Sequence, residues 1–291
     1  MNGSRISQTF QRYQLVIFFV LAYGFTWAYW VQQALVLRGL LDGKVPEFLS
    51  IVAGYGPALA AIIVTGIVSG RAGLGQLFRR LVLWRVGIQW YVVALFLPAA
   101  TALTALGIHR LLGGTTSSAA TPPTLEFIPG APLGQQILIM AFIFILGFDG
   151  LGEEMGWRGF ALPRLLSRYS ALTASLILGM FWALWHLPYA LTPGSAMSVQ
   201  PFYTYLPGII ARAILFTWIF NHTKGSLLIA ILYHAAGNLT VNVLPALVPG
   251  VYDVGVWGTV VQWMVVVAVV LYTGPAHLSR KTSVVSAGSS A

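Results

Sequence analysis

Long apolar runs separated by short polar segments dominate the pattern of hydrophobic and polar positions along the chain. Each run is close to the length of about 20 residues that an α-helix needs to cross a bilayer. The runs cover residues 13–36, 48–69, 88–108, 134–157, 171–191, 202–220, 225–247 and 255–272. Backbone polar groups inside a bilayer must be satisfied within the chain, so runs of this length are typical of helices. The pattern predicts an all-α, polytopic membrane helical bundle with about eight transmembrane helices.

The segments between these runs suggest no second, soluble domain. The first run is longer than the apolar core of a signal peptide, so we interpret it as a retained first span. Residues 70–87 alternate leucine and phenylalanine with arginine; a helix lying on the membrane surface and an anchoring loop both fit, and we favour the loop. We expect the Pro/Ser/Thr-rich residues 109–132 to be irregular and residues 273–291 to be a disordered tail. We therefore interpret residues 1–291 as a single integral membrane domain.

Composition supports the same conclusion and excludes some chemistry. Of the 291 residues, 57% are hydrophobic and only 8% are charged, whereas soluble domains have about 25% charged residues. The chain has no cysteine, which excludes disulfides, thiolate metal sites and a cysteine nucleophile.

The basic residues predict an orientation. If the N-terminus is cytoplasmic, twelve of the sixteen Lys and Arg residues lie on the inner side, so the rule that inner loops are positively charged favours both termini cytoplasmic. Basic inner loops facing anionic membrane lipid also explain the net charge of +9 without a nucleic-acid partner. We expect a multi-pass protein, of the plasma membrane if the source is bacterial. The twelve residues are Arg5, Arg12, Arg71, Arg79, Arg80, Arg85, Arg158, Arg164, Arg168, Lys224, Arg280 and Lys281.

Three of the seven acidic residues lie in the fourth apolar run: Asp149, Glu153 and Glu154. Charges inside a membrane are costly and usually mark function, with a partner nearby. Glu154 and Arg158 are four residues apart and share a helix face, so they can pair. Glu153 points about 100° away and needs another partner. Small residues in the same segment allow close helix packing; they are Gly147, Gly150, Gly152, Gly156 and Gly159.

Two intramembrane histidines are the candidate partners. If the fourth and fifth runs form a hairpin that turns near residues 169–170, then Glu153 and His186 are level with each other. His234 and Asn238 are four residues apart on the seventh run and can point into one cavity. Arg212 is the remaining intramembrane charge, which either pairs with Asp149 or reaches toward an interface. We predict that a carboxylate, two imidazoles and an amide converge inside the bundle.

These residues resemble the motifs of the CPBP family of intramembrane proteases, which includes the type II CAAX prenyl endopeptidases and Abi-like bacterial relatives linked to bacteriocin processing or self-immunity. The family motifs EExxxR, FxxxH and HxxxN read here Glu153–Arg158, Trp182–His186 and His234–Asn238. The first and third match fully. Trp182 stands where the family usually has Phe, which leaves an aromatic wall but changes the size of the pocket. The motif-bearing core covers about 134–247.

The resemblance implies an intramembrane endopeptidase that acts on a membrane-associated or lipidated, CAAX-like peptide. By this resemblance Glu153 is the general base that activates water and His186 holds that water. His234 and Asn238 then stabilise the oxyanion, and Glu154 and Arg158 orient the site. No cofactor is needed, and the site is expected to be reached from the cytoplasmic side or from the bilayer.

Three alternatives remain open from the sequence. In the first, Glu153, His186 and His234 bind zinc in a metalloprotease, although the chain lacks an H-E-x-x-H motif. In the second, the charges form an ion relay in a transporter, although the sequence shows no internal repeat. In the third, the protein is a catalytically silent immunity or scaffold protein. The sequence does not indicate an oligomeric state.

Overall fold

The computed structural model describes residues 2–115, 130–195, 197–198, 201–248, 250–251 and 254–280. These residues form helices joined by turns, without a strand, which confirms the all-α prediction. Much of the expected irregular segment 109–132 and residues 281–291 of the expected disordered tail lie outside the described residues. The longer helices are α1 (Asn2–Leu37), α3 (Gly56–Arg79), α4 (Ile88–Leu111), α5 (Leu133–Leu146), α8 (Ala171–Trp185), α10 (Phe202–His222), α11 (Leu227–Asn242) and α13 (Gly255–Thr273).

Shorter helices connect or extend the longer ones. They are α2 (Phe48–Gly54), α6 (Glu154–Gly156), α7 (Leu162–Leu166), α9 (Leu187–Ala190) and α12 (Leu244–Leu247).

Within the described residues, six helical stretches are long and apolar enough to cross a membrane. α8 and α11 are also apolar but have only 15 and 16 residues, whereas a span needs about 20. The protein is therefore an integral, multi-pass membrane protein. The predicted count of eight full spans is not confirmed, and the cytoplasmic position of both termini stays a prediction. The six stretches are Phe10–Leu37, Gly56–Val82, Ile88–Leu111, Leu133–Leu166, Phe202–His222 and Gly255–Thr273.

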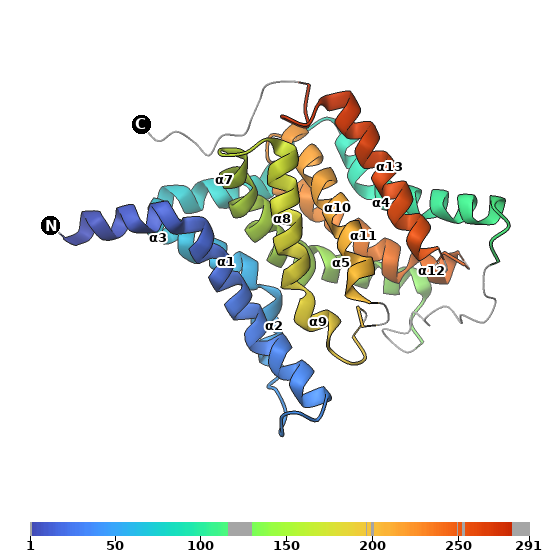
Figure 1. The fold of residues 1–291 in the computed structure, drawn as a ribbon, viewed down its shortest axis with the longest axis horizontal. Helices are drawn as coiled ribbons and strands as arrows, with labels where there is room; N and C mark the ends of the chain where they lie inside the picture. Colours follow the sequence, from blue (N-terminus) through green and yellow to red (C-terminus); the bar gives the residue numbers. More distant parts are fainter. Residues whose placement is uncertain are drawn as a thin grey trace.

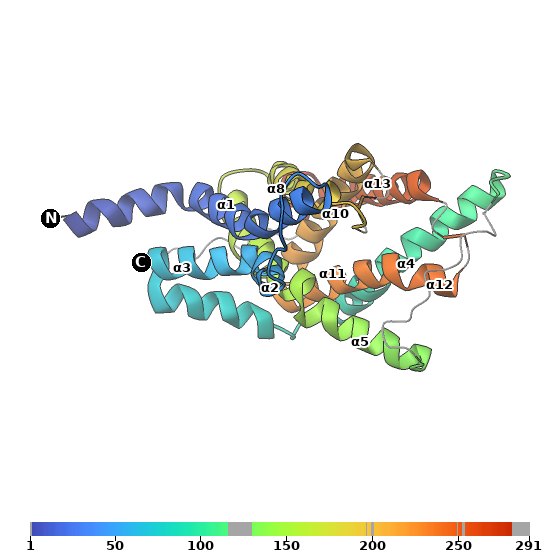
Figure 2. The ribbon, with the colours of Figure 1, turned by 90° about the horizontal axis from the view of Figure 1, so that it is seen from below.

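Helices that are far apart in the sequence lie side by side. α1 packs along α3, α8 along α10, and α11 along α4, while α13 packs against both α4 and α10. Figure 1 shows α10 and α11 between α8 on one side and α13 on the other, and Figure 2 shows the N-terminal end of α1 projecting beyond the other helices. α10 and α11 are therefore central to the bundle, where their side chains can reach several neighbours.

The second predicted span is divided, and the helix after it is longer than expected. α2 ends at Gly54, and α3 begins at Gly56 with Pro57 in its first turn, a position where proline favours helix initiation. Gly70 has φ of 59°, which suits glycine and kinks α3, but the helix continues to Arg79. The anchoring loop that we favoured for residues 70–87 is therefore wrong for the residues up to Arg79.

The predicted hairpin between the fourth and fifth runs is present. α7 ends at Leu166 and α8 begins at Ala171. The Ser170 hydroxyl oxygen accepts a hydrogen bond from the Thr173 backbone N–H and caps the start of α8. The turn therefore lies near residues 169–170, so that Glu153 and His186 are equally far from it along the chain.

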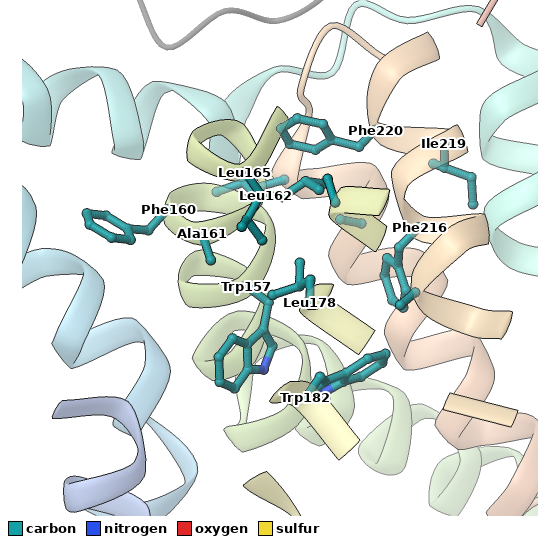
Figure 3. Packing of buried hydrophobic residues seen from close by; sticks show 14 of the residues in the cluster. Trp157, Phe160, Ala161, Leu162, Leu165, Leu178, Trp182, Phe216, Ile219 and Phe220 are labelled. Atoms are coloured by element: carbon teal, nitrogen blue, oxygen red, sulfur yellow. The ribbon is translucent and has the colours of Figure 1, made fainter. Parts of the chain in front are cut away.

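Large aromatic side chains fill the centre of the bundle. Trp157, Phe160, Trp182 and Phe216 are at most 2% exposed, and Figure 3 shows Trp157 and Trp182 near each other at one end of this cluster. The Trp182 and Phe216 rings meet edge to face, with centroids 5.6 Å apart. This packed layer borders the acidic segment, where Trp157 and Trp182 both contact Glu153.

Candidate active site

The helix that carries the three acidic residues is interrupted. α5 ends at Leu146, and residues 148–153 and 157–161 form π-helical turns on either side of α6. A π-helical turn inserts an extra residue into a helix and changes the direction of the side chains, and such turns are frequent at functional sites. The continuous helix predicted over 134–157 is therefore wrong within the motif itself.

Two glycines of this segment bring neighbouring backbone into contact. A Cβ atom added to Gly152 would lie 2.6 Å from the carbonyl oxygen of Gly54, and one added to Gly156 would lie 2.7 Å from the carbonyl oxygen of Pro57. A larger side chain would push the end of α2 away from Gly152 or the start of α3 away from Gly156. The predicted packing role of these small residues is thus confirmed at both positions.

Glu153 is 3% exposed, and one of its carboxylate oxygens is fully engaged. Its Oε2 accepts hydrogen bonds from two indole nitrogens, Nε1 of Trp157 at 3.0 Å and Nε1 of Trp182 at 2.5 Å. Two N–H donors on one oxygen fix the plane of the carboxylate. The other oxygen, Oε1, faces His186.

His186 lies level with Glu153, as the hairpin predicted. Its Nδ1 is 2.8 Å from the carbonyl oxygen of Trp182, and since a carbonyl oxygen only accepts, the ring proton is on Nδ1. The neutral ring therefore keeps its lone pair on Nε2. That atom is 3.9 Å from Oε1 of Glu153, which is too long for a direct hydrogen bond.

Glu154 holds a second histidine in place. Its Oε1 accepts from Nη1 of Arg158 at 2.8 Å and lies 2.6 Å from Nδ1 of His234, with both carboxylate and guanidinium fully buried. The predicted pair between Glu154 and Arg158 is confirmed. The contact between Glu154 and His234 was not predicted, because the two residues are on different helices. It leaves Nε2 of His234 as the ring nitrogen that is not bonded to Glu154.

The Arg158 guanidinium lies between two aromatic faces. Its Cζ is 4.2 Å from the ring centroid of Trp182 and 3.7 Å from that of Phe216. Cation–π contacts of this kind stabilise a desolvated cation by about 2 kcal/mol or more. The aromatic layer therefore supports the charge that neutralises Glu154.

Asn238 contacts a carboxylate that the sequence had not assigned to it. Its Nδ2 donates to Oδ2 of Asp149 at 2.8 Å. Arg212 and Asp149 form no ion pair within 4.0 Å, so the suggested pairing between them is wrong. The Asn238 amide nitrogen has a second N–H beyond the one that it donates to Asp149.

Trp182 links the parts of the site. Its ring centroid is 6.1 Å from that of His186 and 5.7 Å from that of His234. We predicted an aromatic wall at this position, and the structure adds an N–H donor to Glu153 that a phenylalanine would lack. The exchange relative to the family motif therefore brings a hydrogen bond as well as a larger ring.

Two further residues border the site and were missed by the sequence reasoning. Trp157 bonds Glu153, and its position four residues after Glu153 was the available signal. Tyr205 of α10 packs edge to face on His186 with ring centroids 5.7 Å apart. No motif marked α10, so Tyr205 had no signal in the sequence.

This arrangement offers proton acceptors and hydrogen-bond donors within one buried volume. No group of three or more His, Cys, Asp or Glu side chains among the described residues is arranged to hold a metal ion. The zinc alternative with Glu153, His186 and His234 stays a prediction. The free acceptors that face each other are Oε1 of Glu153 and Nε2 of His186.

Comparison with known proteins finds the same region. Residues 135–240 match the family described as Rce1-like, type II CAAX prenyl endopeptidase. The chain is also 29% identical over 187 residues to a protein of Methanococcus maripaludis named CAAX prenyl protease 2, an alignment that covers 62% of this chain and 64% of that relative. All three motifs lie within the matched residues, so the part of the chain that carries the candidate site is similar to the Rce1-like type II CAAX prenyl endopeptidases.

Proposed function

We propose that this protein is an intramembrane endopeptidase in which Glu153 activates a water molecule. The observation that carries the proposal is the separation of 3.9 Å between Oε1 of Glu153 and Nε2 of His186. The other polar atom of each side chain, Oε2 of Glu153 and Nδ1 of His186, is held by a hydrogen bond. A water molecule can lie about 2.8 Å from each of these acceptors. Two acceptors can take both O–H groups of one water, which directs a lone pair of its oxygen toward a substrate carbonyl.

In the proposed reaction, the water oxygen bonds to the carbonyl carbon while one water proton moves to Glu153. The carbonyl oxygen becomes negatively charged, and the C–N bond then breaks as Glu153 returns its proton to the leaving amine. Atoms and charge balance with one water consumed for each bond cleaved. Burial beside the aromatic layer favours this chemistry because it limits competing solvent.

His234 and Asn238 are the proposed donors to the developing oxyanion. Glu154 accepts from Nδ1 of His234, and in the proposed role the doubly protonated imidazole donates from its Nε2–H. Asn238 is held by Asp149 through one N–H and has a second N–H to offer. Donors fixed before the reaction stabilise the oxyanion without reorganisation. Glu154 and Arg158 act here as positioning residues.

We propose a mechanism without a metal and a substrate that is a peptide of a membrane-associated or lipidated protein. The substrate class is supported by the family match and by the name of the archaeal relative. A prenylated C-terminal peptide and an unmodified leader peptide are the two classes to compare. Activity that survives exhaustive chelation and metal analysis supports the glutamate mechanism, whereas activity restored only by added zinc contradicts it.

The test is cleavage of both peptide classes by the purified protein in detergent, with Glu153→Gln against wild type. We expect kcat to fall at least about 100-fold, because glutamine accepts no proton from water. Glu47→Gln is the matched control, since Glu47 is exposed at the start of α2 and caps nothing. Glu153→Gln with wild-type kcat would contradict the proposal, as would a folded wild-type protein that cleaves neither peptide class.

A further inference from the structure

Arg212 is a cation inside the membrane region that neither the motifs nor the proposed reaction uses. It is partly buried on α10, and its guanidinium lies against α11, where a Cβ atom added to Gly237 would be 3.5 Å from its Nη1 and 3.7 Å from its Cζ. Gly237 comes directly before Asn238 and three residues after His234. The guanidinium therefore reaches the helix that carries the proposed oxyanion donors.

Helix spacing places Arg212 on the face of α10 that borders the site. Tyr205, which packs on His186, is seven residues before Arg212, and seven residues make about two full turns, or about 10 Å along the axis. Phe216, one turn further on, contacts the His234 ring with centroids 5.9 Å apart. Arg212 is also close enough to His186 and Tyr205 to act on them electrostatically.

Among the described residues, Arg212 has no carboxylate partner. The carboxylates that form ion pairs within 4.0 Å are those of Glu153 and Glu154, and neither pairs with Arg212. The nearby carboxylate of Asp149 accepts from Asn238 instead. An intramembrane cation is costly, and its usual reason is a partner or a function. The guanidinium therefore has no ion pair among the described residues and can bind an anion that a ligand brings.

We propose that Arg212 binds the C-terminal carboxylate of the peptide substrate, an inference that rests on the proposed endopeptidase function. A guanidinium binds a carboxylate through two parallel N–H···O bonds, and every unblocked peptide ends in a carboxylate.

Acidic side chains of a substrate and phosphates of lipids are other sources of an anion, and the experiment separates them. Three peptides differ only in their carboxylates. The first ends in a free carboxylate, and the second is the same peptide with a C-terminal carboxamide. The third ends in a free carboxylate but has Asn and Gln in place of Asp and Glu. Each is cleaved by wild type, Arg212→Gln and Arg212→Lys. The assays run in neutral detergent and in vesicles that contain phosphatidylglycerol.

We expect wild type to show a KM at least about 10-fold higher for the carboxamide than for the free acid, which corresponds to the loss of about 1.4 kcal/mol. Arg212→Gln should raise KM for the free acid until the two peptides are equal, and Arg212→Lys should keep part of the preference. Arg168→Gln is the matched control, because Arg168 is exposed in the turn before α8, and it should keep the wild-type ratio.

Several results would overturn the inference. They are a wild-type KM ratio near one, an unchanged ratio in Arg212→Gln, a preference that follows the acidic side chains, and one that appears only with phosphatidylglycerol. The wild-type ratio needs no variant, so the test holds even if Arg212→Gln does not fold. If wild type cleaves no peptide, the endopeptidase proposal itself fails. If wild type cleaves and Glu153→Gln does not, an equal ratio refutes only the role of Arg212.

Discussion

The buried pair of Glu154 and Arg158 leads to a quantitative prediction about stability. Both side chains are fully buried, and Arg158 Nη1 is 2.8 Å from Glu154 Oε1. At an effective dielectric constant of about 20, two unit charges about 4 Å apart attract by about 4 kcal/mol. Arg158→Met removes this attraction and both aromatic contacts while it keeps an apolar stem of similar length. We expect it to lower the free energy of unfolding by about 3–5 kcal/mol, the usual cost of an uncompensated buried charge.

A double-mutant cycle separates the charge pair from packing. Glu154→Gln removes the negative charge and leaves an oxygen that still accepts from His234. In that background Arg158→Met leaves no buried carboxylate without its partner. We therefore expect its loss in free energy of unfolding to be about 2–3 kcal/mol smaller than in wild type. Reversible unfolding in mixed detergent and SDS micelles gives the free energy of unfolding of wild type, the two single variants and the double variant. Arg168→Met is the control, and this exposed substitution should change stability by no more than about 0.5 kcal/mol.

The refuting result is additivity. If Arg158→Met costs the same with and without the Glu154 carboxylate, the two charges do not stabilise each other. The guanidinium would then contribute only through its packing between Trp182 and Phe216.

Two further predictions test the surroundings of the proposed base. Trp182→Phe removes one of the two N–H donors to Glu153 Oε2 but keeps an aromatic ring. We expect the variant to fold and its kcat for peptide cleavage to fall about 10-fold. An unchanged kcat would contradict a role for this hydrogen bond. Gly156→Ala places a Cβ atom 2.7 Å from the backbone carbonyl of Pro57, and we expect it to destabilise the protein by about 1–3 kcal/mol in the same unfolding assay. Gly258→Ala is its control, because nothing lies within 4 Å of a Cβ atom there, and equal effects of the two substitutions would refute the steric argument.

Properties that depend on local spacing followed from the sequence alone. Apolar runs of membrane length predicted an all-helical membrane protein, since the bilayer fixes both the length and the type of a spanning element. The spacing of four residues predicted the pair of Glu154 and Arg158 because helix geometry fixes it. The hairpin near residues 169–170 predicted that Glu153 and His186 are level, and the distance of 3.9 Å confirms this.

Contacts between helices were decided only by the tertiary structure. His234 contacts Glu154, and Asn238 donates a hydrogen bond to Asp149. The sequence had suggested Arg212 as the partner of Asp149. These partners depend on how far each helix is rotated about its axis. Two π-helical turns change that rotation within the acidic segment itself. The sequence therefore determined which polar groups enter the membrane and at about which level, whereas only packing decided which of them meet, because one residue of helical rotation turns a side chain by about 100°.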